Sequence, residues 1–142
     1  MRGNECPCPL KSTVPTEDFL PAYDFGGGMR LVHDPDGAAH PLATEVEYAE
    51  SILEQGRGLM FRSSIPDDYA LVFPFDHASR QFIHMLFVRF PLDVLWLVDE
   101  EVQAVDTLQP WRSIGYATAD TVIELPGGAA SDVSEGDTVR LE

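Results

Sequence analysis

The chain has 142 residues, of which 44% are hydrophobic, so it is long enough for one domain with a substantial core. It carries 24 acidic against 9 basic residues, and a net charge of −15 repels nucleic-acid phosphates and anionic membrane surfaces. We therefore expect no nucleic-acid partner and no membrane partner. No basic segment followed by an apolar one opens the chain, so we expect no secretory signal and a cytoplasmic location.

The acidic residues are scattered between apolar segments, which argues against a disordered acidic tail. A high net charge keeps a protein soluble where salt screens other effects and causes self-repulsion where salt is dilute. Together with a single lysine, Lys11, this composition resembles that of proteins from the salt-rich cytoplasm of halophilic archaea. We expect a salt-adapted archaeal protein.

Residues 1–28 differ from the rest of the chain. They contain Cys6 and Cys8 in a proline-rich context, a run of three glycines at 26–28 and no hydrophobic periodicity. We predict an extended or disordered arm over 1–28 and a single β domain over 29–142. The two thiols lie one residue apart and have no second pair, so we predict no metal centre and no cofactor.

Short apolar segments separated by turn sequences follow the arm. A strand is expected at 29–33, and Asp34-Pro35-Asp36-Gly37 is strong turn chemistry. Further strands are predicted at 43–49, 70–75, 80–88, 92–98, 102–108, 121–125 and 138–142, with a turn at 76–79.

One helix interrupts the strands. Ser51 followed by Glu54 is a capping-box pattern, which predicts a helix from about Ile52 that Gly56 and Gly58 end quickly. Eight or nine short strands with one short helix predict a mostly β fold, either a compact antiparallel β-barrel or a jelly-roll-like sandwich.

No nucleophile motif and no phosphate-binding glycine loop occurs in the sequence. Of the four histidines, His77 follows Asp76 in a predicted turn and His84 lies inside an apolar segment. A divalent metal held by these histidines with Asp76 or Asp93 is one interpretation. An exposed turn histidine and a core histidine bonded to the backbone explain the same pattern without a metal.

The sharpest candidates are charged residues inside apolar segments. Arg57 and Arg62 bracket Gly-Leu-Met-Phe, while Asp93 and Glu124 have apolar neighbours on both sides. A buried carboxylate without a partner is costly, and arginine is its natural partner. One interpretation is a closed ion pair from Arg57 or Arg62 to Asp93 or Glu124. The other is an open pocket that binds a ligand, such as a sugar-like or carboxylate molecule.

The leading functional hypothesis is a small-molecule or partner-binding module, monomeric or weakly dimeric. Its site would contain Arg57, Arg62, His84, Asp93 and Glu124. One alternative is a metal-dependent or acid/base hydrolase that uses His84 with Asp93 or Glu124. Another is a structural or interaction protein whose ion pairs only hold the fold.

Four motifs occur in an order that resembles the domain of unknown function 192 family over residues 43–142. They are "RGLMFR" at 57–62, "HM" ahead of "PLD" at 84–93, "IELPGG" at 123–128 and "GD" at 136–137. The matching positions are Arg57, Gly58, Leu59, Met60, His84, Met85, Pro91, Leu92, Asp93, Glu124, Gly128, Gly136 and Asp137.

The resemblance implies a compact, mostly β domain with a sandwich-like or jelly-roll-like architecture and no established activity. This chain departs from the family at His84, where many bacterial members have tryptophan, and at Leu86-Phe87, where they have a Lys-Asn-like sequence. A ligand role attached to that segment therefore does not carry over.

Salt adaptation predicts that the melting temperature falls when the protein is transferred from molar to millimolar salt, because unscreened carboxylates repel one another. Thermal unfolding across a salt series measures this effect. A constant melting temperature over the whole series contradicts it.

Overall fold

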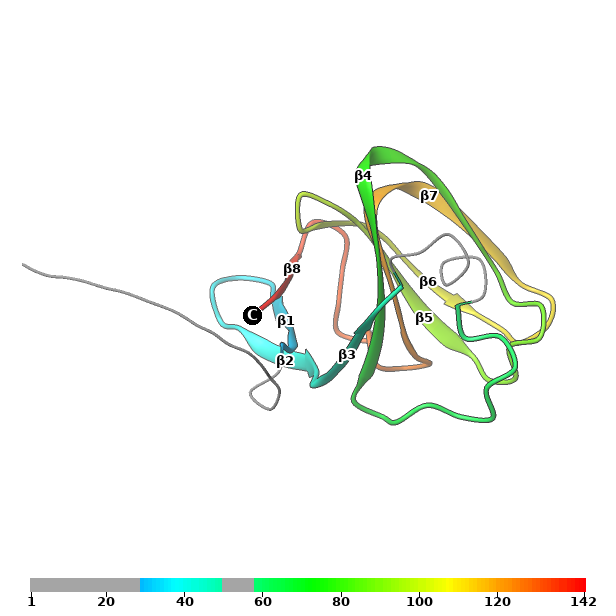
Figure 1. Cartoon of the computed structure of the whole chain (residues 1–142). Coiled ribbons are helices and arrows are strands. Elements are labelled where there is room, and N and C mark those ends of the chain that lie inside the picture. The colour runs from blue at the N-terminus through cyan, green and yellow to red at the C-terminus, as the bar shows by residue number, and fades with distance from the viewer. Residues whose placement is uncertain (1–28, 50–57) are drawn as a thin grey trace, which may run out of the picture.

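The computed structural model describes residues 29–49 and 58–142, which form one strongly curved sheet of eight strands (Figure 1). The predicted arm at 1–28, the helix near Ile52 and Arg57 lie outside the described residues. The sheet confirms a mostly β fold. Within the described ranges, no helix is long and apolar enough to cross a membrane.

The strand order across the sheet is β2-β1-β8-β6-β5-β7-β4-β3. The strands in chain order are β1 (Leu31–Asp34), β2 (His40–Ala43), β3 (Glu45–Tyr48), β4 (Tyr69–His84), β5 (Leu92–Val98), β6 (Glu101–Leu108), β7 (Ile114–Pro126) and β8 (Thr138–Leu141).

Strand β4 is longer than the sequence predicted. The turn expected at 76–79 is instead a bulge, because both halves of β4 pair with the same strand β7. The register shifts between Pro74 and Ser79. Proline has no N–H to donate to a ladder, so it belongs at such an irregularity. Beyond the bulge the two long strands bend together, as Figure 1 shows at the top of the molecule.

The pairing of β3 with β4 is parallel and is the exception in the described sheet, for which the sequence predicted an antiparallel barrel or a jelly-roll-like sandwich. A parallel pair requires a long crossover connection, and residues 49–68 supply it. Residues 58–62 therefore belong to this crossover, and Leu59 and Met60 pack on the same face of the sheet as Leu71, Phe73 and Val94.

The central part of the sheet, at 69–73 on β4, 92–97 on β5 and 122–125 on β7, is buried on both faces, because alternate side chains enter two separate apolar clusters. The first core includes Leu71, Phe73, Val94, Trp96 and Val122. The second core contains side chains that alternate with these along the same strands, among them Val72, Leu95, Leu97, Ile123 and Leu125. Two residues adjacent on a central strand therefore face different cores.

The C-terminal strand is held to the N-terminal one by a partly buried polar contact. Gly136 has a φ of 91° and turns the chain into β8, which pairs with β1. The Asp137 carboxylate accepts a hydrogen bond from the Ser134 N–H at 2.9 Å and contacts His33 Nε2 at 2.8 Å. The bond with His33 holds the pKa of Asp137 below its ordinary value.

Candidate functional site

Asp93 is buried on the second-core side of β5, where backbone groups and one hydroxyl surround its carboxylate. Oδ1 accepts a hydrogen bond from Thr107 Oγ1 at 2.9 Å. Oδ2 accepts from the Gly128 N–H at 3.0 Å and the Ala130 N–H at 2.9 Å. The two backbone bonds fix the turn after β7, in which Gly128 has a φ of 92°, and the bond from Thr107 joins Asp93 to β6. Asp93 therefore holds a turn and needs no arginine.

Arg62 pairs with a different carboxylate from those predicted. Its Nη2 lies 3.2 Å from Glu47 Oε1, and its guanidinium carbon lies 5.4 Å from the centre of the Tyr69 ring. The predicted ion pair from Arg62 to Asp93 or Glu124 is therefore wrong. Glu47 lies on the exposed edge strand β3, where an ion pair loses less hydration than in the core. The corresponding prediction for Arg57 falls outside the described residues.

His84 lies far along the sheet from the two predicted carboxylates. Its Nδ1 accepts a weak hydrogen bond from the Leu86 N–H at 3.3 Å, and the residue pairs with Ile114 at the start of β7. Glu124 is near the end of β7, and Asp93 faces the other core. The five predicted site residues therefore do not form one described cluster. The described ranges also contain no group of three His, Cys, Asp or Glu residues able to hold a metal.

Glu124 instead lies in the middle of a polar row that crosses the first-core face of the sheet. The pairing registers place Glu47 opposite Leu71, Leu71 opposite Glu124, Glu124 opposite Val94 and Val94 opposite Asp106. Residues directly opposite one another point to the same face. Three carboxyl groups thus alternate with two apolar side chains along this row.

Both outer carboxylates of the row have partners. Glu47 Oε1 accepts a hydrogen bond from the Tyr69 hydroxyl at 2.6 Å, and Asp106 Oδ2 accepts from Trp96 Nε1 at 2.9 Å. Glu124 is 4% exposed, and its Oε1 has no hydrogen-bond partner among the described residues. The middle carboxyl group is therefore the one that stays unsatisfied within the described part of the chain.

A glycine lies directly against the Glu124 carboxyl group. Gly58 has a φ of 52°, and a Cβ at this position would lie 3.5 Å from Glu124 Oε1 and 3.6 Å from Phe73 Cζ. These are ordinary contact distances, so the left-handed backbone, which glycine adopts without strain, is what lets residues 58–62 turn next to the acid. Residues 58–62 thus begin directly beside the Glu124 carboxyl group.

The environment gives the carboxyl groups different protonation states. Burial raises the pKa of Glu124 to about 8, so this group is neutral at pH 7. The hydrogen bond from Tyr69 lowers the pKa of Glu47, which stays ionised. Burial, followed by the bond to Glu47, raises the pKa of the Tyr69 hydroxyl, which stays protonated. Among the described residues, the row therefore presents a neutral acid with an unpaired oxygen, Glu124, and a charged, hydrogen-bonded one, Glu47, on the other side of Leu71.

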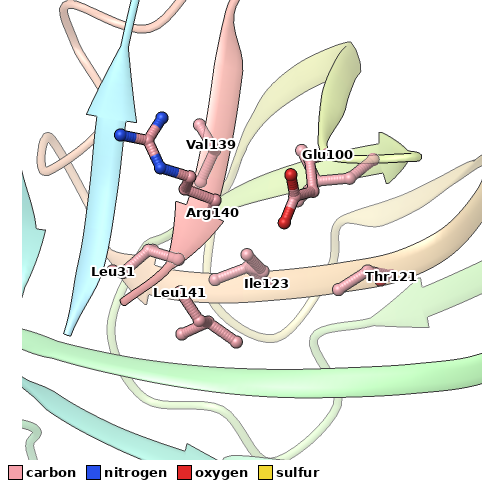
Figure 2. A pocket seen from close by; sticks show the side chains of 8 residues that line it. Leu31, Glu100, Thr121, Ile123, Val139, Arg140 and Leu141 are labelled. Atoms are coloured by element: carbon pink, nitrogen blue, oxygen red, sulfur yellow. The ribbon is translucent and has the colours of Figure 1, made fainter. Parts of the chain in front are cut away.

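A separate small pocket lies on the other side of the sheet, between β1, β7 and β8 (Figure 2). It has a volume of about 110 Å³, well below the roughly 300 Å³ of a typical small-molecule site. Arg140 points toward β1, where its Nη1 lies 3.1 Å from Asp34 Oδ2, and the Glu100 side chain lies at the opposite rim. None of the predicted site residues lines this pocket.

Sequence reasoning missed Glu47, Tyr69 and Asp106. Each belongs to a predicted strand or lies next to one, and each has a polar group on its side chain. Nothing in the sequence, however, indicated that these groups lie on one face of the sheet. The row becomes apparent only from the register, because Glu47 and Asp106 come from strands on opposite sides of the β4–β7–β5 centre.

Residues 32–141 match the DUF192 family model, which is described as "Uncharacterized ACR, COG1430". The UPF0127 protein of Thermococcus gammatolerans is 35% identical over 102 residues, which cover 68% of this chain and 66% of that protein. The UPF0127 protein TK1120 of Thermococcus kodakarensis is 32% identical over 100 residues, which cover 67% of this chain and 63% of that protein. The chain thus spans slightly less than two thirds of the length of these relatives.

Two solved structures share the fold. A protein of Sinorhizobium meliloti 1021, described as a candidate transcription regulator, has a TM-score of 0.71 and 24% identity, over 79% of this chain and 92% of that one. A protein of unknown function from Novosphingobium aromaticivorans DSM 12444 has a TM-score of 0.69 and 24% identity. The match covers 78% of this chain and 83% of that one. At this identity the likeness concerns the fold alone.

We expect Asp93→Asn to lower the free energy of unfolding by about 2 to 3 kcal/mol, because an amide replaces a charged acceptor of buried hydrogen bonds. Urea unfolding measures the loss. Asp99→Asn is the control, since Asp99 is exposed and its φ of 51° suits asparagine, and it should change stability by less than about 0.5 kcal/mol. Equal effects of the two substitutions would contradict a structural role for Asp93.

Glu124 should make stability fall as pH rises. Between its ordinary pKa of 4.5 and its folded value of about 8, the unfolded chain releases a proton that the folded chain retains. The free energy of unfolding then falls by up to about 1.4 kcal/mol per pH unit and becomes constant with respect to this group above pH 8. Urea unfolding from pH 5 to 9 should show this slope in the wild type but not in Glu124→Gln. Parallel pH profiles would mean that Glu124 is ionised in the folded protein.

Proposed function

Because the chain belongs to the DUF192 family, whose description assigns no activity, we propose a function from the geometry of the chain itself. We propose a binding module for a small organic molecule that presents an amino group, or another hydrogen-bond donor, to Glu124. An apolar body on the ligand suits the surroundings, since the flanking side chains are those of Leu71, Phe73 and Val94.

The observation that carries this proposal is the missing partner of Glu124 Oε1 among the described residues. A buried polar atom without a hydrogen bond costs about 1 to 3 kcal/mol, and native proteins leave few of them. The neighbouring acids of the same row have protein partners, which makes Glu124 the exception. A ligand donor would supply the hydrogen bond that the described part of the chain does not.

The raised pKa of Glu124 determines how such a ligand would bind. A cationic amine favours the ionised carboxylate, so its binding at pH 7 would release one proton from Glu124. Its affinity would therefore increase with pH until about pH 8. A neutral hydroxyl donor would bind the protonated carboxyl group and show no such dependence.

The remaining hypotheses have less support. An acid/base or metal-dependent hydrolase would need His84 close to Asp93 or Glu124, but the described strands place these residues apart. Nucleic-acid binding is opposed by the net charge of −15. Asp93 fits the purely structural alternative, while the unsatisfied Glu124 does not. We further propose that the protein acts in a salt-rich cytoplasm, without nucleic-acid or membrane partners.

A thermal-shift panel tests the proposal on the full chain at pH 6.5 and pH 8.5, in high salt. The probes are alkyl amines, guanidinium compounds, polyols, Mg²⁺ and Zn²⁺. A ligand present at 100 times its Kd stabilises the folded state by about 2.7 kcal/mol. We expect an amine or guanidinium compound to raise the melting temperature, and to do so more at pH 8.5.

Glu124→Gln should abolish that shift without losing the fold, because glutamine resembles the neutral acid in shape. Glu100→Gln, at an exposed position, is the matched control and should retain the shift. Titration calorimetry in two buffers of different ionisation enthalpy would detect the released proton. A panel in which no member raises the melting temperature contradicts the proposal, and so does an equal shift in Glu124→Gln.

A further inference from the structure

The β1–β2 hairpin forms one wall of another pocket, which is larger than the pocket in Figure 2. Its volume is about 470 Å³, within the roughly 300 to 1,000 Å³ typical of small-molecule sites. The turn before β4 and the segment 127–137 after β7 complete its walls. Four titratable side chains line it, those of His33, His40, Asp67 and Asp132, and no described Lys or Arg does.

His33 is the buried group of this pocket, and Asp137 fixes the orientation of its ring. The residue is 5% exposed, and its Nε2 lies 2.8 Å from Asp137 Oδ2, which also accepts the Ser134 N–H. The bond with His33 keeps the pKa of Asp137 below its ordinary value, so this carboxylate is ionised at pH 7. An ionised carboxylate can only accept hydrogen bonds. His33 Nε2 therefore carries the proton of this contact.

The same contact makes the other ring nitrogen of His33 an acceptor. In a neutral imidazole, a proton on Nε2 leaves a free lone pair on Nδ1. Nδ1 has no hydrogen bond within the described ranges. Glu124 Oε1 is the one described side-chain atom that is both fully enclosed and unpaired, so Nδ1 is not enclosed. Because His33 lines the pocket, its lone pair is available to a ligand there.

The other three titratable groups of the pocket are acceptors as well. His40 lies directly opposite His33 in the pairing of β1 with β2, so both side chains project from the same face of the hairpin. Asp67 and Asp132 are exposed, and neither forms an ion pair within the described ranges. These two carboxylates are therefore available to a cation.

Backbone hydrogen bonds hold both acids in place. Next to the first acid, the carbonyl of Asp68 accepts the Thr44 N–H at 2.9 Å. On the other wall, the Val133 N–H donates to the Ala130 carbonyl at 3.0 Å, and Asp132 lies between these two residues in the chain. A site on fixed backbone loses less conformational freedom when a ligand binds than a site on loose backbone does.

We propose that this pocket binds an aliphatic diamine or polyamine. Every polar side chain that the described residues place around it can accept hydrogen bonds, and two are negatively charged, so the ligand supplies N–H donors and positive charge. A metal ion fits less well, because the described ranges contain no group of three His, Cys, Asp or Glu residues able to hold one. Acceptors on separate walls suit a cation with several ammonium groups along a flexible chain.

This site is distinct from the one proposed around Glu124. Glu124 lies on the first-core face of the sheet, between Leu71 and Val94, and offers one unpaired oxygen among apolar groups. The pocket lies beside the second core, against which its lining residues Leu42 and Ala129 pack. A diamine bound in the pocket therefore does not depend on Glu124.

Titration calorimetry of the full-length Glu124→Gln variant tests this site apart from the other one. The probes are 1,4-diaminobutane, spermidine, butylamine and Mg²⁺, at the lowest salt concentration at which the protein stays folded. We expect both polyamines to bind, and butylamine, which has a single ammonium group, to bind at least about tenfold more weakly. An absence of polyamine binding overturns the proposal. Equal binding of Mg²⁺ also overturns it, since that would reflect charge alone.

Asp67→Asn together with Asp132→Asn should weaken spermidine binding about tenfold or more. Both positions are exposed, so the fold should be unaffected. The matched control is Asp99→Asn with Glu100→Gln, which removes two charges at exposed positions in the β5–β6 turn and should leave the affinity unchanged. Equal losses in the two double variants contradict the proposed site.

His33→Gln separates the histidine from the effect of charge. The glutamine amide can donate to Asp137 in place of Nε2, but it has no nitrogen in place of Nδ1. We expect spermidine to bind about tenfold more weakly, while circular dichroism shows the same fold. Nitrogen NMR of the imidazole should show an unprotonated His33 Nδ1 whose resonance moves when spermidine is added. A protonated Nδ1 in the free protein, or a resonance that does not move, overturns the assignment.

Discussion

The covering of both faces of the sheet, at 69–73 on β4, 92–97 on β5 and 122–125 on β7, determines what happens to the polar groups that lie there. A polar side chain in these covered stretches cannot turn toward water, so it forms a hydrogen bond inside the protein or remains unsatisfied. Asp93 and Glu124 lie on neighbouring strands and meet this constraint in opposite ways. Asp93 accepts three hydrogen bonds and organises a turn, whereas Glu124 is neutralised by burial and has an oxygen without a partner among the described residues.

The sequence predicted the parts of the fold that depend on local pattern. The alternation at 43–49, the apolar segment at 92–98 and the turn at 34–37 correspond to β3, β5 and the β1–β2 connection. The turn expected at 76–79 became a bulge because its two flanking segments pair with one continuous partner. That partner lies more than thirty residues away in the chain, so local turn chemistry could not reveal it.

The candidate site was predictable only in part, because here too the contacts depend on strands that are distant in the sequence. Apolar neighbours correctly marked Asp93 and Glu124 as buried, but neighbours in sequence do not determine the face of the sheet or the partner. Asp93 is satisfied mainly by backbone N–H groups, which every residue carries and which therefore leave no sequence signal. Arg62 pairs with Glu47 because the crossover between β3 and β4 brings Arg62 to the edge of the sheet.

The bulge in β4 is a place where residues could be added or removed without shifting the pairing of β4 with β7. Five steps along β4, from Pro74 to Ser79, correspond to two steps along β7, from Thr121 to Ala119, so the surplus residues already lie outside the ladder. Asp76, His77 and Ala78 are exposed there. Insertions or deletions at this point would change the size of a solvent-facing bulge and would leave the rest of the register intact. During evolution, chain length can drift at this bulge while the pairing around Glu124 stays constant.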